Sequence, residues 1–243
     1  MGQVEPRSKL RPCHCRKRCR TLYAHDLATG ALRWVWTDQR HGTDIGDRPN
    51  STATVYGSRI FLTRACNALV AAVDRTTGRA ISQRQIHTEL YGDTEYRLSV
   101  ADETGALYVG SHDGGGRVRA LEQSTGAERW SARVPGAVYR LALTDRVLVV
   151  ASANGVTGLD RATGRRLWSR AMTPTDGGLA TGGGLAFVAD DSPEIPVLEV
   201  ASGRLLRRIP VGVSTCGYAL ARGRLFAVGT STSGERSILA LGR

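Results

Sequence analysis

The sequence contains no run of apolar residues long enough to cross a membrane. Aromatic residues are scarce, at 6% of 243 residues, and only three of them are phenylalanine. Five cysteines, an odd number, argue against a disulfide framework. The basic residues near the amino terminus are not followed by an apolar stretch, so they do not form a signal peptide. The remaining chain, with 29 glycines, suits one domain that can bury a core.

One eleven-residue phrase recurs along the chain with its spacing intact. Residues 24–34 read AHDLATGALRW, which follows the pattern A-x-D-x-x-T-G-x-x-x-W. The phrase returns at residues 72–82, 120–130 and 158–168 and, in a worn form, at 197–207. Its glycine-to-glycine steps are 48 (30→78), 48 (78→126), 38 (126→164) and 39 (164→203). A near-constant period of this length is typical of repeat architectures.

The residues between the phrases identify the repeated unit. Short β-rich runs split by turn residues come four to a repeat, as at 96–100, 106–111, 118–122 and 128–133. Strands this short, four in about forty residues, indicate the blades of an all-β propeller. The expected quartets are residues 52–84, 95–133, 137–171 and 177–209, with a strand pair at 21–36 and three strands in 213–243.

This strand count predicts about five to six blades in residues 21–243. Pairing of the C-terminal strands with the N-terminal ones would close the ring and hide both sheet edges. The alternative is an N-terminally incomplete ring, which would leave two edges exposed.

Each part of the phrase has a structural role in this interpretation. The Asp accepts hydrogen bonds from the backbone of its own turn, and the Gly takes the positive φ that ends the turn. The Trp lies on the outermost strand, where a large flat side chain can pack against the neighbouring blade. The residues assigned to this structural role are Trp34, Trp130, Trp168, Gly30, Gly78, Gly126 and Gly164.

The phrase, together with LYVGSHDG at residues 107–114, resembles the repeat of the quinoprotein (PQQ-like) β-propellers. That family includes PQQ-dependent alcohol dehydrogenases and the non-enzymatic outer-membrane assembly lipoproteins of the BamB type. The resemblance covers residues 21–243 and implies that each Trp docks between adjacent blades. The Gly-His and Trp-Asp pairs of WD40 repeats and a kelch pattern are absent.

The resemblance leaves the function open between two classes. A resemblance to the family's enzymes implies PQQ and a calcium ion on the axis of an eight-bladed ring, together with adjacent cysteines and a carboxylate base. This sequence has no Cys-Cys pair and no recognisable calcium constellation. We therefore expect a non-catalytic scaffold that binds another protein or a small polar ligand and holds no cofactor. The alternative is a PQQ-dependent dehydrogenase, with PQQ and calcium, or a fragment of a larger sensor or assembly protein.

Two insertions mark one face of the propeller as the candidate binding face. They follow the fourth strands of the first two blades, at residues 37–50 and 85–95, and insertions on one face of a repeat protein often mark its binding face. The loops between second and third strands open on the same face, and the Thr-Gly turns lie on the opposite one. Because the residues of the candidate binding face lie on exposed loops, we expect that they can be replaced with little loss of stability. The candidate ligand-face residues are His41, Asp44, Arg64, Asn67, His87, His112, Asp113, Asp190, Asp191 and Glu194.

Residues 1–20 differ in composition from the rest of the chain. Seven Lys and Arg against one Glu give this segment +6 of the net charge of +11. Such an arm can bind nucleic acid or a membrane surface, but it carries no specific nucleic-acid motif, and we expect a disordered tail. Cys13, Cys15 and Cys19 lie beside His14 without the paired spacing of a zinc site. With no visible signal the default compartment is the cytoplasm, and it is extracytoplasmic if the true start lies upstream.

Overall fold

Residues 21–37, 53–63, 69–85, 96–111, 115–190, 192–230 and 234–241 are described by the computed structural model, and the tail and most of both insertions lie outside these ranges. Every regular element in the described ranges is a β-strand, and the strands form six antiparallel sheets that follow one another along the chain. No helix in these ranges is long and apolar enough to cross a membrane.

Four of the sheets are complete blades with their strands in sequence order. They begin and end within three residues of the predicted quartets, which confirms the repeat of four-stranded units. The strands are β3 (Ala53–Tyr56), β4 (Arg59–Thr63), β5 (Leu69–Asp74) and β6 (Ala80–Gln85); β7 (Tyr96–Ala101), β8 (Ala106–Ser111), β9 (Arg117–Glu122) and β10 (Glu128–Arg133); β11 (Val138–Leu143), β12 (Val147–Ser152), β13 (Gly155–Asp160) and β14 (Arg166–Arg170); β15 (Pro174–Gly182), β16 (Leu185–Asp190), β17 (Glu194–Glu199) and β18 (Leu205–Pro210).

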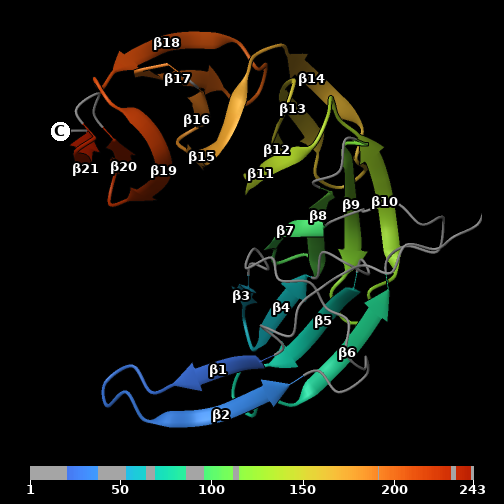
Figure 1. Ribbon diagram of the computed structural model, residues 1–243. Coiled ribbons are helices and arrows are strands. Elements are labelled where there is room, and N and C mark those ends of the chain that lie inside the picture. The colour runs from blue at the N-terminus through green and yellow to red at the C-terminus, as the bar shows by residue number, and fades with distance from the viewer. Residues whose placement is uncertain are drawn as a thin grey trace, which may run out of the picture.

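The two ends of the chain form smaller sheets. β1 (Thr21–His25) and β2 (Leu32–Thr37) make a two-stranded sheet, and β19 (Ser214–Ala221), β20 (Arg224–Thr230) and β21 (Arg236–Leu241) make a three-stranded one. Figure 1 shows the six sheets as an open arc with the first strand of each complete blade on its inner side. Among the described strands β1 pairs only with β2 and β21 only with β20, so of the two alternatives these strands form the open one and not a ring closed by their pairing.

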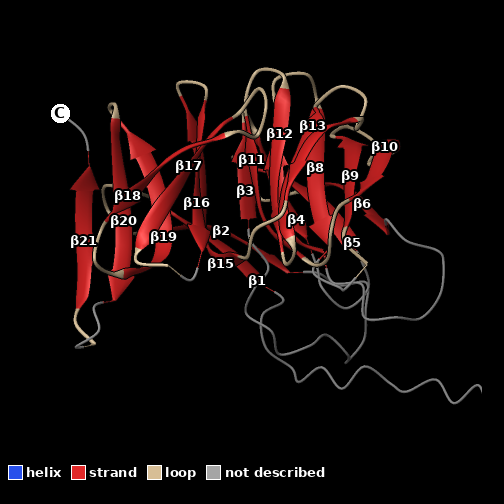
Figure 2. Cartoon of the chain, turned by 90° about the horizontal axis from the view of Figure 1, so that it is seen from above, coloured by secondary structure: helices blue, strands red, loops and turns tan. Residues whose placement is uncertain are grey.

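Burial follows the position of a strand within its blade. All six residues of β8 and of β12 are buried, whereas most residues of the outer strands β10 and β14 are exposed or half-buried. Adjacent blades stand side by side (Figure 2) and pack through apolar clusters such as Tyr108, Val118, Leu148 and Leu159. The second and third strands are therefore the most apolar, because both of their faces are covered by neighbouring blades.

The Asp-x-x-Thr-Gly segment forms the turn between the third and fourth strands. Asp74 Oδ1 accepts hydrogen bonds from the backbone nitrogens of Thr76 (2.9 Å) and Thr77 (2.7 Å) and from the Thr77 hydroxyl (2.9 Å). These bonds, chiefly the one from the Thr77 backbone, hold the pKa of Asp74 below its usual 3.8. Gly78 closes the turn at φ 71°, in the left-handed region that glycine favours.

The tryptophan of each intact phrase reaches into the corresponding turn of the next blade. Its indole N–H donates to the carbonyl oxygen of the residue that follows the phrase's Asp or Glu. The three bonds are Trp34 to Arg75 (3.0 Å), Trp130 to Arg161 (3.1 Å) and Trp168 to Val200 (2.7 Å). The ring also covers the turn's glycine so closely that an added Cβ would lie 2.4–2.7 Å from indole carbons, at Gly78, Gly164 and Gly203.

The first residue of the phrase is small because it lies beside the tryptophan ring. Gly158 pairs across the hairpin with Trp168, and a Cβ on Gly158 would lie 2.3 Å from that indole. Ala120 faces Trp130 in the same way. In the worn copy, Val197 faces Arg207 and no indole needs the space. The first residue and the tryptophan of the phrase are thus cross-strand neighbours, and the residue that faces each indole is small, as Ala24, Ala120 and Gly158.

Candidate functional site

The structure describes two of the predicted ligand-face residues, Asp190 and Glu194. The others fall outside the described residues, so their positions remain predictions. They are His41, Asp44, Arg64, Asn67, His87, His112, Asp113 and Asp191.

Asp190 is not the exposed loop carboxylate that we expected. It ends β16, and its side chain is only 7% exposed. Oδ1 accepts hydrogen bonds from the Ser192 backbone (3.1 Å) and hydroxyl (2.5 Å), and Oδ2 accepts from Arg208 (3.0 Å). Glu194 lies 3.9 Å from the same guanidinium. The expectation of an exposed Asp190 is wrong, because this carboxylate holds its own loop and pairs with Arg208.

Comparison of the repeats shows what kind of position Asp190 occupies. The last residue of the second strand is polar and fully buried in the three preceding blades, as Thr63, Ser111 and Ser152. The Ser152 hydroxyl bonds to the carbonyl oxygens of Pro135 (2.9 Å) and Gly155 (3.1 Å), and Ser111 Oγ accepts from the Arg117 backbone (2.7 Å). Asp190 is a carboxylate variant of this loop-stabilising position, and an alignment of the repeats would have revealed it.

A groove of about 1010 Å³ lies on the opposite face, where the β11–β14 and β15–β18 blades meet. Four hairpin turns surround it, those of β11–β12, β13–β14, β15–β16 and β17–β18, and we call it the turn-face groove. Leu167 on β14 and Leu206 on β18 are 37% and 39% exposed. The other apolar lining residues are Leu143, Val147, Leu185, Val200 and Ala201, and the charged ones are Asp145, Arg146, Asp160, Arg165 and Glu199.

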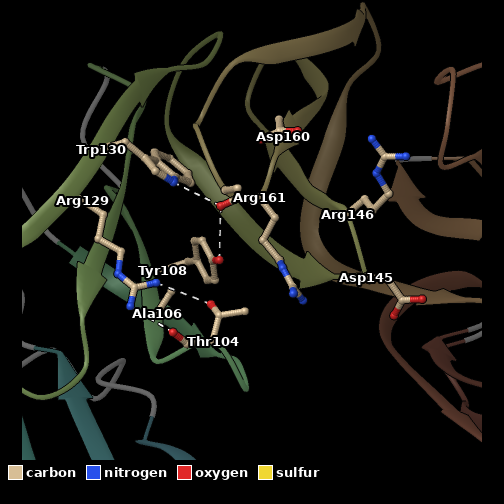
Figure 3. Close-up of a pocket in the computed structure, with 10 residues that line it drawn as sticks. Thr104, Ala106, Tyr108, Arg129, Trp130, Asp145, Arg146, Asp160 and Arg161 are labelled. Atoms are coloured by element: carbon tan, nitrogen blue, oxygen red, sulfur yellow. Dashed lines mark hydrogen bonds between the residues drawn. The ribbon is translucent and has the colours of Figure 1, made fainter.

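No sequence pattern predicts this groove. Leu167 and Leu206 lie on outer strands, where single exposed leucines are ordinary, and their meeting depends on how two blades pack. The sequence predicts the binding face on the other side, away from the Thr-Gly turns. A second hollow of about 420 Å³ adjoins the groove on the turn side and shares Asp145, Arg146 and Asp160 with it (Figure 3).

A buried polar network forms the wall of this second hollow. The Asp102 side chain is 1% exposed; Oδ2 accepts from the Tyr108 hydroxyl (2.7 Å) and lies 3.5 Å from Arg161 Nε of the next blade. Tyr108 and Trp130 both point to the Arg161 carbonyl oxygen, at 3.3 and 3.1 Å (Figure 3). Arg161 also pairs with Glu103 at 2.7 Å. This network joins two blades through charge as well as through packing.

The pKa of Asp102 is set by opposing effects. Burial alone raises it, but the hydrogen bonds from Tyr108, Thr104 and the Ala106 backbone, with the positive charge of Arg161, outweigh burial and bring it below 3.8. Burial and the bond to Asp102 raise the pKa of Tyr108 well above 10. Asp102 is therefore ionised and Tyr108 protonated at neutral pH, so the network is a fixed ion pair with a neutral hydroxyl.

The calcium and PQQ of the family's enzymes would need a cluster of oxygen ligands. In the part of the chain that the structure describes, no three His, Cys, Asp or Glu side chains lie close enough together to hold a metal ion. The buried carboxylates Asp102 and Asp190 are each committed to an arginine and to their own turns. A calcium ion takes about six to eight oxygen ligands. The described residues do not fit such a calcium–quinone site.

Successive four-stranded antiparallel blades, joined by an indole seated on the next blade's turn, define a β-propeller built from PQQ-like repeats. A family model described as "Outer membrane protein assembly factor BamB" matches residues 13–155 and again residues 153–241. The chain belongs to this BamB-like family of PQQ-repeat propellers, as the resemblance of the phrase implied. No curated protein matches the sequence.

Solved structures share the fold at low sequence identity. BamB from Moraxella catarrhalis is 19% identical, with a TM-score of 0.51 over 91% of this chain and 79% of its own. The computationally designed Ika8 protein is 15% identical, with a TM-score of 0.68 over 91% of this chain and 65% of its own. A europium-containing methanol dehydrogenase is 15% identical, with a TM-score of 0.59 over 78% of this chain and 47% of its own. These likenesses concern the fold alone, and this chain spans less than half of the dehydrogenase.

Proposed function

We propose that the protein is a non-catalytic binding scaffold and that its ligand is a segment of another protein held in the turn-face groove. The observation that carries this proposal is the groove itself, about 1010 Å³ with partly exposed leucines on both walls. Contiguous exposed apolar surface rimmed by polar residues commonly marks an interaction site.

The chemistry of the groove suits a polypeptide better than a single small ion. Leu167 and Leu206 offer apolar surface to side chains of a partner, and burial of such surface is worth about 25 cal/mol per Å². The rim carries both signs of charge, with Arg146 and Arg165 near Asp145. Mixed charges around an apolar floor favour register and orientation of a bound segment over attraction of one ion.

The carboxylates near the groove support a structural role. Asp160 Oδ1 accepts from the Thr163 backbone (2.9 Å) and hydroxyl (2.8 Å), and Glu199 accepts from the Ser202 hydroxyl. These contacts repeat the turn bonds of the other phrases. Each turn thus uses its own carboxylate for a structural task, and the proposed function assigns these carboxylates no cofactor.

The proposal is tested with the full chain and a random peptide library displayed on phage. Selected peptides are synthesised and their affinity is measured by isothermal titration calorimetry. Leu167→Glu and Leu206→Glu place a charge on the apolar walls and should each weaken binding by about tenfold or more.

Ile81→Glu is the matched control. Ile81 occupies on β6 the phrase position that Leu167 occupies on β14, and at 43% exposure it is equally accessible but does not line the groove. Its variant should bind like the wild type. Equal binding by the groove variants and the control would contradict the proposal, as would a selection that enriches no peptide.

A further inference from the structure

Two arginines lie directly opposite each other in the β7–β10 blade. Arg117 begins β9 and Arg133 ends β10, and the two are cross-strand partners. Such partners stand on the same face of a sheet, with Cβ atoms about 4.5–5.5 Å apart, and like charges at these positions destabilise the pair. The other complete blades oppose no two like charges at this end, where the partners are Leu69 with Gln85, Val156 with Arg170, and Glu194 with Pro210.

The positive charge of the two opposed arginines is not neutralised within the part of the chain that the structure describes. Their strands β9 and β10 carry two carboxylates, and both are paired with other arginines. Glu122 pairs with Arg129 at 2.6 Å, and Glu128 pairs with Arg119. Neither opposed arginine forms an ion pair with a described residue, so their mutual repulsion has no counter-charge there.

A hydroxyl lies beside the opposed arginines on the same face. Ser131 is the cross-strand partner of Arg119, one position further along both strands on this face. Ser131 is exposed, and its hydroxyl bonds to no group among the described residues. Leu121 continues the face and packs with Phe61 of the preceding blade, so the face is turned toward the β3–β6 blade. Two guanidinium groups and a hydroxyl thus stand together as hydrogen-bond donors.

The opposed arginines lie at the end of the blade away from its Thr-Gly turn. β9 begins and β10 ends there, whereas the turn at residues 123–127 joins the other ends of these strands. This end belongs to the face on which the sequence predicts a binding site, and the turn-face groove lies on the opposite face. A ligand held here is therefore independent of the proposed peptide site.

We propose that Arg117 and Arg133, together with the Ser131 hydroxyl, bind a phosphate group. A guanidinium presents a planar fork of N–H donors that matches two phosphate oxygens. Two forks and a hydroxyl can share the oxygens of one tetrahedral anion, and the anion replaces the repulsion between the arginines by attraction to a common partner. A carboxylate carries one negative charge and would neutralise only one of the two cations, so a phosphate dianion is the better match.

The test titrates the full chain with inorganic phosphate and, separately, with phenyl phosphate, by isothermal titration calorimetry in chloride buffer of constant ionic strength. Saturable binding of both probes would identify a phosphate group carried by a larger molecule, and binding of inorganic phosphate alone would identify the free ion. Binding of neither would overturn the proposal. Arg133→Gln removes one fork and one charge and should weaken binding by about tenfold or more.

Arg170→Gln is the matched control. Arg170 is a cation at the same end of the next outer strand, β14, and it faces the apolar Val156 across the hairpin. Its variant loses the same charge from the protein and should bind phosphate like the wild type. Phosphate binding that Arg133→Gln leaves unchanged would place the anion elsewhere, for instance on the basic residues 1–20, and would overturn the proposal.

Thermal denaturation supplies a readout that separates an anion site from a structural arginine. In chloride buffer at low ionic strength, Arg133→Gln should melt at a higher temperature than the wild type, because it removes the repulsion. Phosphate at ten times its dissociation constant should raise the melting temperature of the wild type and of Arg170→Gln by about 3 °C or more, but not that of Arg133→Gln. A lower melting temperature of Arg133→Gln in chloride would mean that a carboxylate of the chain already pairs with Arg133, and would overturn the proposal.

Discussion

The indole of Trp168 lies over Gly203 of the next blade and donates a hydrogen bond to the Val200 carbonyl oxygen at 2.7 Å. The two partners belong to different copies of the same phrase. A copy that has its tryptophan contributes a ring to the blade ahead, and its glycine turn faces the blade behind. The phrase thus encodes both halves of an interface, although the second and the worn copies keep the glycine, Gly78 and Gly203, without a tryptophan.

Ser82→Trp should stabilise the protein. Ser82 holds the tryptophan position of the second phrase and faces the small Ala72, and the next turn presents Gly126, half-buried, at φ 70°. An indole at position 82 can cover Gly126 and donate to the Gln123 carbonyl oxygen. We expect the free energy of unfolding to rise by about 1–2 kcal/mol.

Urea denaturation measures this change. Ser82→Phe supplies a ring without the N–H and should stabilise less than Ser82→Trp. A loss of stability in Ser82→Trp would show that the second blade boundary does not share the geometry of the others.

Asp102 should make the free energy of unfolding depend on pH in the acidic range. Its pKa in the folded protein lies below 3.8, because its hydrogen bonds and Arg161 outweigh burial. A lowered folded-state pKa gives stability that is complete above the unfolded-state pKa and is lost as the pH falls through the folded-state value. The wild type should thus exceed Asp102→Asn by a constant margin between about pH 5 and 7, and that margin should shrink below about pH 4.

The difference between the two unfolding curves cancels the titration of Asp26, Asp74 and Asp160, whose pKa values are lowered in both proteins. What remains is the titration of Asp102 together with that of Glu103, which shares Arg161 with it. A margin independent of pH down to about pH 2 would mean that Asp102 stabilises the blades without its charge.

Asp190→Ala should be clearly destabilising, contrary to what its sequence position suggests. Removal of this buried carboxylate leaves Arg208 and Ser192 without their partner, at an expected cost of about 1–3 kcal/mol. Asp176→Ala is the control, because Asp176 is exposed on β15 and its loss should cost less than about 0.5 kcal/mol. If thermal denaturation shows the same loss of stability for Asp190→Ala and Asp176→Ala, the structural role of the Asp190 carboxylate is contradicted.

PQQ should not bind in a saturable way. The tryptophans near the blade boundaries would report a quinone on the axis by quenching of fluorescence, so the full chain is titrated with PQQ, with and without calcium. We expect only the linear attenuation caused by absorption of light by PQQ. Saturable, calcium-dependent quenching at micromolar concentration or below would favour the dehydrogenase alternative over the binding scaffold.

The sequence predicted those parts of the molecule that depend on local periodicity. The quartet at residues 95–133 became β7 to β10 within one residue, and the turn at Asp74 has the expected bonds. Such features follow from strand alternation and turn chemistry within one blade. Pattern reasoning could thus supply the blades, their order and their outer strands.

The features that the sequence did not predict depend on contacts between blades. Asp102 and Arg161 lie 3.5 Å apart but far from each other in the chain, and Leu167 and Leu206 share a groove only because two blades pack together. Asp190 looked like a loop residue because its partner, Arg208, is on another strand. A single sequence does not encode such pairings in any local spacing.

The most direct test of the central claim is a double-mutant cycle on Trp168 and Gly203, with unfolding free energies from urea denaturation. Trp168→Ala should cost about 3–5 kcal/mol, because a large ring leaves the boundary between two blades. Gly203→Ala should cost more than about 2 kcal/mol in the wild type, where the Cβ collides with the ring, but only about 1 kcal/mol in Trp168→Ala, where backbone strain alone remains. Equal costs of Gly203→Ala in both backgrounds would contradict the docking of each blade's tryptophan on the next blade's turn.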